Sequence, residues 1–151
     1  MAVIFTYLRM CKPITSLSMT THSTNRPDEG YMQKKFDGPT KRFCQTLDLK
    51  DDPGLIADYC RLHEQGHVWQ EILEGIRSVG ILEMEIYLLG TRLFMIVETP
   101  TDFDWQAAMA RLATLPRQAE WEALTARFQQ ALADAASAEK WQLMQRIFHL
   151  Y

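Results

Sequence analysis

The segment from Tyr59 to Trp69 holds more side chains capable of chemistry than any other part of the sequence. His63 and His67 lie four residues apart in a literal H-E-x-x-H string. On a helix this spacing places two imidazoles on one face, where they can bind zinc while the glutamate acts as a general base. Tyr59 also lies one helical turn before His63, a spacing that could present a hydroxyl and an imidazole to a sugar. The two interpretations imply different enzymes.

The zinc interpretation has one local difficulty. Gly66 lies inside the string, and a glycine in a helix interior costs about 1 kcal/mol where zinc ligands must be held rigidly. Glu83 or Glu85 could supply a third ligand, but a short string of this kind recurs by chance and counts only in context. The sequence therefore favours chemistry without a metal, and no cofactor is predicted.

Composition narrows the class of protein. A chain of 151 residues, 47% of them hydrophobic, predicts one domain with a substantial core. A net charge of −3 and scattered Lys and Arg give no surface for nucleic acid. Since no run of about 18 apolar residues occurs, no membrane span is predicted. Three cysteines without a C-x-x-C spacing indicate a reduced, cytoplasmic protein.

The chain divides near residue 40. Residues 1–40 are rich in Thr, Ser, Pro and Met and show no lasting hydrophobic period. They are predicted to be a disordered extension or a mis-assigned start, with a targeting segment as a third possibility. Residues 41–151 are predicted to be the folded domain.

Hydrophobic periodicity predicts six main elements within that domain. Asp52 and Pro53 are typical of the beginning of a helix, which is predicted to continue, with an interruption at Gly66, as far as Gly80. Gly90-Thr91 predicts a tight hairpin, and Pro116 a break between two helical pieces. The predicted strands are 42–49, 81–89, 93–98 and 141–150, and the other predicted helices are 103–112 and 117–132.

The order β-α-β-β-α-β predicts an α+β fold, the ferredoxin-like split βαβ unit. Such a unit leaves one sheet face without helices, so two copies packing face to face would form a dimeric α/β barrel with a pocket in each half. The chain is therefore predicted to be a homodimer. On the second strand, polarity predicts that the apolar set faces the helices and the polar set faces away; these sets are Met84, Ile86 and Leu88, and Glu83, Glu85 and Tyr87.

An ordered series of short motifs resembles the L-rhamnose mutarotase family, and most strongly its L-fucose mutarotase-like branch. The resemblance extends from Lys41 to Leu150, and it implies a dimer that interconverts the α and β anomers of a 6-deoxy sugar. The motifs are Tyr59-x-x-x-His63, Trp69-x-Glu71-Ile72-Leu73, Glu85-Ile86-Tyr87, Arg92-Leu93-Phe94-Met95, Glu120-Trp121-Glu122 and Ile147-Phe148-His149-Leu150.

The resemblance also implies roles for individual side chains. His63 matches the family's catalytic histidine, a proton donor whose ordinary pKa suits transfer near neutrality. Tyr59 is expected to contact a sugar oxygen, and Trp121 to stack on the sugar ring. Ring opening requires both a base and an acid. Glu85 is our prediction for the second group, made on polarity rather than on family correspondence.

Two departures from the family pattern bear on the substrate. Rhamnose enzymes carry two adjacent tryptophans where this chain has Trp121-Glu122, and a tyrosine near the position of Met84. We therefore expect L-fucose rather than L-rhamnose, with Met84 among the residues that contact the sugar. Two other functions stay open on the same barrel: a cofactor-free oxygenase and a small-molecule binding module.

Overall fold

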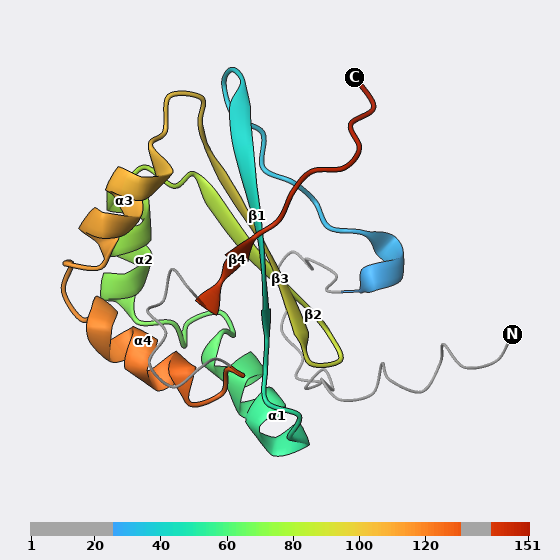
Figure 1. Cartoon of the computed structure of the whole chain (residues 1–151), viewed down its shortest axis with the longest axis vertical. Helices are drawn as coiled ribbons and strands as arrows, with labels where there is room; N and C mark the ends of the chain where they lie inside the picture. Colours follow the sequence, from blue (N-terminus) through green and yellow to red (C-terminus); the bar gives the residue numbers. More distant parts are fainter. Residues whose placement is uncertain (1–25, 131–139) are drawn as a thin grey trace, which may run out of the picture.

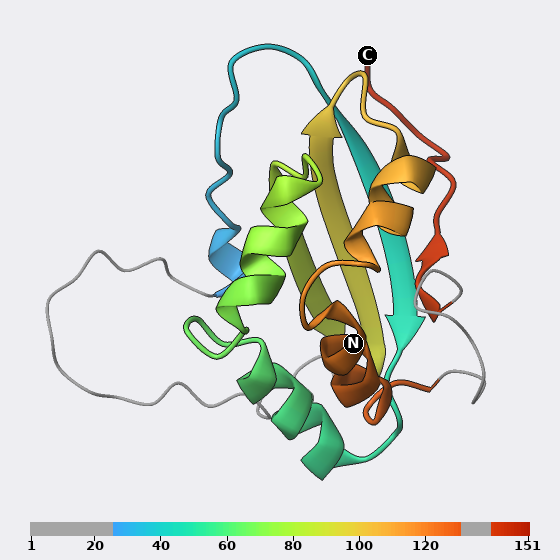
Figure 2. The same cartoon turned by 90° about the vertical axis from the view of Figure 1, so that its left-hand side faces the viewer.

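The computed structural model describes residues 26–130 and 140–151, so predictions for residues 1–25 lie outside the described residues. It forms a four-stranded antiparallel sheet in the order β2-β3-β1-β4. All four α-helices of the described residues lie on one face of this sheet (Figures 1 and 2). The predicted α+β, ferredoxin-like fold is confirmed. Its elements are η1 (Pro27–Glu29), β1 (Thr40–Asp48), α1 (Pro53–Leu62), α2 (Gln70–Ser78), β2 (Glu83–Leu89), β3 (Arg92–Pro100), α3 (Trp105–Leu112), α4 (Gln118–Ala126) and β4 (Gln142–Leu143).

Side-chain alternation assigns the two faces of the sheet. Met84 and Ile86 on β2 pair with Val97 and Met95 on β3, and all four belong to the apolar layer beneath the helices. Apolar residues of β1, among them Leu47, complete this layer. The predicted orientation of β2 is confirmed, because burial of these side chains against the helices removes apolar surface from water. No helix within the described ranges is long and apolar enough to cross a bilayer.

The prediction of one long helix after Pro53 is wrong in one respect. The chain forms two helices, α1 and α2, joined by a turn that runs from His63 to Trp69. Gly66 lies in this turn with φ +88°, a left-handed conformation that glycine adopts without steric cost. The hydrophobic period continues through both helices because both pack on the same core, and periodicity alone therefore did not reveal the change of direction.

The last strand is much shorter than the predicted span of 141–150. Only Gln142 and Leu143 pair with β1, and the following amide of Met144 donates to the Cys44 carbonyl. The chain then leaves the sheet, and its apolar side chains Ile147 and Phe148 are 93% and 74% exposed. The alternation of residues 141–150 predicts a strand whose apolar side chains are buried within the same domain. No described part of this chain covers Ile147 or Phe148.

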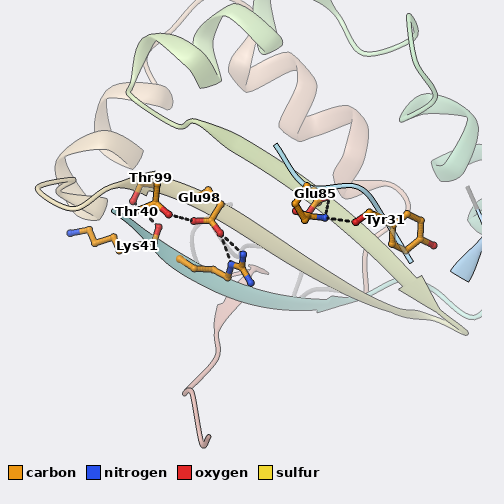
Figure 3. Close-up of polar contacts among 8 residues, drawn as sticks. Tyr31, Thr40, Lys41, Glu85, Glu98 and Thr99 are labelled. Atoms are coloured by element: carbon orange, nitrogen blue, oxygen red, sulfur yellow. Dashed lines mark hydrogen bonds and ion pairs between the residues drawn. The ribbon is translucent and has the colours of Figure 1, made fainter. Parts of the chain in front are cut away.

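Residues 26–39, which were expected to lack structure, run past the sheet on the side away from the helices (Figure 1). Tyr31 packs edge-on against Tyr87, and Gln33 donates a hydrogen bond to Glu85 at 3.3 Å. Farther along the same face, Glu98 accepts hydrogen bonds from Thr40 and Arg42 (Figure 3). The outer face of β2 and β3 is therefore polar and partly covered by the chain's own N-terminal side.

Replacement of Asp52 tests the predicted beginning of α1. Its side chain accepts hydrogen bonds from the amides of Gly54 and Leu55, at 2.8 and 3.0 Å. We expect Asp52→Ala to lower the free energy of unfolding by about 1 kcal/mol, as loss of such a cap usually does. Urea denaturation measures the change. Asp51→Ala is the control, since this neighbouring exposed aspartate does not cap the helix; an equal loss in both variants would contradict the assignment.

Candidate active site

A cavity of about 1020 Å³ lies between the helices and the inner face of the sheet. Its size is in the range of small-molecule sites. The side chains that α2, α3 and the strands contribute to its wall are mostly apolar, with Arg77, Gln106 and Glu83 among them. Another part of the wall carries polar groups from α1, β1 and α4, including Tyr59, His63 and Gln45. The pocket that sequence analysis placed inside each half of the barrel therefore lies on the helix side of the sheet.

His63 is the residue at which α1 ends. Its amide donates to the Cys60 carbonyl, so the Tyr59 carbonyl does not receive the usual helical amide bond. The imidazole of His63 takes the place of the missing amide donor, since its Nδ1 lies 2.9 Å from the Tyr59 carbonyl oxygen. A carbonyl can only accept, which means that Nδ1 carries the proton. In the neutral ring the other nitrogen, Nε2, then has the lone pair.

The surroundings of His63 favour that neutral ring. Burial lowers the pKa of the imidazole below its ordinary value of 6.5, and the hydrogen bond to the Tyr59 carbonyl opposes this only in part. Burial has the opposite effect on Tyr59: it raises the pKa of the phenol above the ordinary value, helped by the nearby Cys60 thiol. At neutral pH the site therefore presents a neutral imidazole as a proton acceptor and a phenol that keeps its proton.

A row of aromatic rings holds these two side chains in place. The Tyr59 and His63 rings stack with centroids 4.2 Å apart. Trp121 meets the His63 ring edge-on at 5.5 Å, and Trp69 meets Trp121 at 5.3 Å. The guanidinium of Arg117 closes the row, 3.8 Å above the Trp69 ring. The row joins α1, the turn before α2, and α4, so the orientation of His63 depends on all three segments.

Four of the five predicted site residues line the cavity: Tyr59, His63, Met84 and Trp121. The structure does not bring Glu85 to them. Glu85 lies on the opposite face of the sheet, where it accepts a hydrogen bond from Gln33 (Figure 3). Polarity correctly predicted that Glu85 faces away from the helices, but it could not show that the cavity lies on the helix side of the sheet.

The second histidine of the H-E-x-x-H string does not share a helical face with His63. His67 follows Gly66 in the turn, and its Nδ1 lies 2.7 Å from the Arg61 carbonyl oxygen. Its side chain is 57% exposed and lies near Glu64. Both histidines therefore satisfy carbonyls at the end of α1. The geometry that zinc binding requires of the string is not formed, and within residues 26–130 and 140–151 no cluster of three potential ligands occurs.

Sequence analysis missed most of the polar wall of the cavity. Gln45 lies on the inner face of β1 between two apolar positions, and it is 7% exposed. Four more polar residues of the wall belong to one face of α4 and the turn after it: Gln118, Glu122, Thr125 and Gln129. Their spacing of four, three and four residues was available in the sequence as a polar face. It was overlooked because a polar helical face is usually taken to face solvent.

Comparison with known proteins places this site in a family. Residues 42–150 match the model of the L-rhamnose mutarotase family, which covers most of the chain. The chain belongs to this family. Its members are isomerases that act on carbohydrates, so the predicted family and enzyme class are confirmed. The match favours the isomerase over the oxygenase and the binding module.

Individual relatives agree with this assignment. An L-fucose mutarotase of Xanthomonas campestris is 46% identical over 110 residues, which cover 73% of this chain and 88% of the relative. A protein of Dictyostelium discoideum is 38% identical over 114 residues, covering 73% and 90% of the two chains. The crystal structure of an L-rhamnose mutarotase from Formosa agariphila superposes with a TM-score of 0.55 at 18% identity, covering 74% of this chain and 99% of that one. That last similarity bears on the fold alone.

Titration of His63 tests the environment deduced for it. Because burial lowers its pKa in the folded state, the unfolded chain binds more protons between the lowered pKa and about 6.5. The free energy of unfolding should therefore fall as pH decreases through this interval, and level off below the folded pKa. NMR titration of the imidazole in native buffer and in denaturant measures the two values. A native pKa above 6.5 would contradict the neutral, buried assignment.

Proposed function

We propose that this enzyme interconverts the α and β anomers of a 6-deoxy sugar, and that L-fucose is its preferred substrate. The observation that carries the proposal is the fixed, neutral His63, which lines the cavity and whose Nε2 has a lone pair. Mutarotation of a sugar is a proton-transfer reaction and needs such a group.

The chemistry proceeds in two reversible steps. His63 Nε2 takes the proton of the anomeric hydroxyl, the bond between C1 and the ring oxygen breaks, and C1 becomes an aldehyde. The imidazolium passes this proton to the ring oxygen and returns to the neutral form, so that one proton moves from O1 to the ring oxygen. On reclosure the imidazole takes the proton back from that hydroxyl. Rotation about the C1–C2 bond turns the other aldehyde face toward the ring oxygen. Reclosure returns one proton to O1, and in that direction the protonated His63 is the donor that the family resemblance implies. The phenol of Tyr59, kept protonated by burial, donates a hydrogen bond to a sugar oxygen.

The divided wall of the cavity fits a sugar that lacks a hydroxyl at C6. The polar side can hydrogen-bond the ring hydroxyls, and Trp121 offers an aromatic face near His63. The apolar side can receive the C6 methyl group, because burying a methyl there gains free energy while a hydroxyl would lose its hydrogen bonds to water. The apolar lining includes Ile72, Ile76, Met84, Met95 and Met109.

The choice of L-fucose rests on two observations. The 46%-identical relative is named an L-fucose mutarotase. In addition, this chain has Trp121-Glu122 where rhamnose enzymes have two tryptophans, so one apolar surface is replaced by a carboxylate beside the cavity.

An NMR exchange experiment tests the activity. We expect the protein to accelerate exchange between the anomeric proton signals of L-fucose, and His63→Ala to reduce this acceleration by about 10²- to 10⁴-fold, the usual contribution of acid–base catalysis. The rate should also decline on the acid side of neutrality, with an inflection below pH 6.5, because protonation removes the Nε2 lone pair.

The matched control is His67→Ala, which removes the exposed histidine of the same turn. This variant should keep the wild-type rate. The proposal would be overturned if the wild-type protein left L-fucose, L-rhamnose and related 6-deoxy sugars exchanging at the buffer rate.

We also propose that the enzyme is a cytoplasmic homodimer. The outer sheet face carries no α-helix among the described residues and is covered in part by residues 26–39. Apolar side chains near the C-terminus are exposed: Leu143, Ile147, Phe148, Leu150 and Tyr151. A second copy of the chain would remove this apolar surface from water. The cytoplasmic part of the proposal rests on the sequence, whose three cysteines are odd in number and lack a C-x-x-C spacing, as is typical of a reduced protein.

Light scattering after size-exclusion chromatography tests the dimer. The expected mass is twice the 17.5 kDa of one chain. Charge introduced by Phe148→Glu should shift the equilibrium toward monomer, because the carboxylate would have to be desolvated at the interface. Ala119→Glu, which adds the same charge on the exposed side of α4, serves as the charge control. A wild-type mass of 17.5 kDa at micromolar concentration would contradict the proposal.

A further inference from the structure

The helix α4 turns an unusually polar side toward the interior of the protein. Its exposed positions are Ala119, Glu120 and Ala123, whereas Gln118 and Thr125 are only 8% and 7% exposed. Trp121 and Leu124 supply the apolar contacts of the helix. The polar side groups lie along the cavity rather than against other side chains of the core. Burial of hydrogen-bonding groups is unfavourable unless they find partners. Gln118 and Thr125 find theirs in Glu122, so these residues form a connected polar group on the cavity wall that can bind a polar ligand.

Glu122 is the charged residue on the inward-facing side of α4. It lies one turn after Gln118, whose side-chain amide donates to Glu122 Oε1 at 3.0 Å. Thr125 donates its hydroxyl to the Glu122 carbonyl one turn later. The side chain of Glu122 is thus held by a buried amide through one oxygen, which leaves Oε2 available to accept hydrogen bonds from the cavity.

The other carboxylate on the cavity wall is arranged differently. Glu83 lies at the beginning of β2 and accepts a hydrogen bond from the amide of the next residue, Met84. It also borders the small hollow on the outer side of the sheet, beside Arg42 and Glu98. Glu122 adjoins Trp121 in sequence, and Trp121 contacts the His63 ring. Of the two, Glu122 is therefore the one on the same helix as an aromatic side chain of the site. Because adjacent helical residues point in different directions, its carboxylate does not share the contact of Trp121 with His63.

We propose that Glu122, oriented by Gln118, determines which sugar the enzyme accepts by binding a pair of neighbouring cis hydroxyls. A carboxylate accepts two hydroxyl hydrogens at once, and hydrogen bonds to a charged group are stronger than neutral ones. This inference rests on the proposed mutarotase function and adds the determinant of its specificity.

The stereochemistry of the two candidate sugars indicates which of them Glu122 would favour. L-Fucose and L-rhamnose differ in configuration at C2 and C4. L-Fucose has its cis pair at C3 and C4, away from the anomeric carbon, and L-rhamnose has it at C2 and C3, next to the reacting centre. With C1 at His63 and the C6 methyl on the apolar wall, a carboxylate across the ring meets the C3–C4 pair of L-fucose. A tryptophan at position 122 would offer no acceptor to that pair.

Steady-state anomer exchange of L-fucose and L-rhamnose, with wild-type protein and three variants, tests this proposal. We expect Glu122→Gln to raise KM for L-fucose about 10- to 100-fold, the range for loss of hydrogen bonds to a charge. It should leave kcat and the pH dependence set by His63 nearly unchanged. Glu122→Trp should shift the ratio of kcat/KM for L-fucose over L-rhamnose by at least about tenfold toward L-rhamnose. Gln118→Leu should resemble Glu122→Gln more weakly, because it leaves the carboxylate but removes the amide that orients it.

Glu74→Gln is the matched control, because Glu74 lies on the exposed side of α2 and accepts a hydrogen bond from the exposed Gln70; its kinetics should equal those of the wild type. A change below twofold in the sugar ratio of both Glu122 variants, with thermal melting showing that they are folded, would overturn the proposal. Loss of kcat together with a changed pH profile would overturn it too, by making Glu122 an acid–base group. Wild-type protein that accelerates neither sugar would instead refute the mutarotase function itself.

Discussion

The site depends on one hydrogen bond, the one between Nδ1 of His63 and the Tyr59 carbonyl at the end of α1. The last carbonyls of a helix lack amide partners, so a side chain that satisfies one of them is held by the backbone itself. In this protein the bond fixes the tautomer and the orientation of the imidazole in a single contact. The aromatic row from Arg117 to Tyr59 then packs the ring from both sides. A loosely held imidazole would sample several orientations, and catalysis by proton transfer depends on a fixed one.

The rest of the fold supports that contact. The turn after α1 bends at Gly66 and brings Trp69 back toward Trp121 of α4. Arg117 at the beginning of α4 joins the row and pairs with Glu71 of α2 at 3.6 Å. The sheet closes the cavity from the other side and contributes Gln45 among apolar neighbours. The helices therefore contact one another around His63, the residue proposed to transfer the proton, and the sheet forms the opposite wall of the cavity. The position of α4 relative to α1 places the polar side chains of α4 on the cavity wall opposite the apolar side chains.

Prediction from the sequence succeeded where local patterns act within one element. The beginning of α1 followed from Asp52 and Pro53, and the hairpin from Gly90-Thr91, because caps and turns are local backbone chemistry. The alternation along β2 correctly assigned its two faces. The same alternation could not show whether Glu85 lies beside the cavity, because no local pattern indicates which face of a sheet adjoins it. The H-E-x-x-H string misled for a related reason: zinc binding presumes a continuous helix from His63 to His67, but α1 ends at Leu62 and Gly66 is left-handed in the turn that follows.

The sequence by itself determined the order of the elements, the membership of the family, and the residues Tyr59, His63 and Trp121 as candidates for chemistry. These follow from the short-range spacing of residue types and from an ordered set of motifs. Only the tertiary structure decided that α4 turns Gln118 and Glu122 inward, and that Glu85 lies on the far side of the sheet from His63. The physical reason is that a polar helical face and a polar strand face read the same whether they meet water or an internal cavity. Packing against distant parts of the chain settles which of the two they meet.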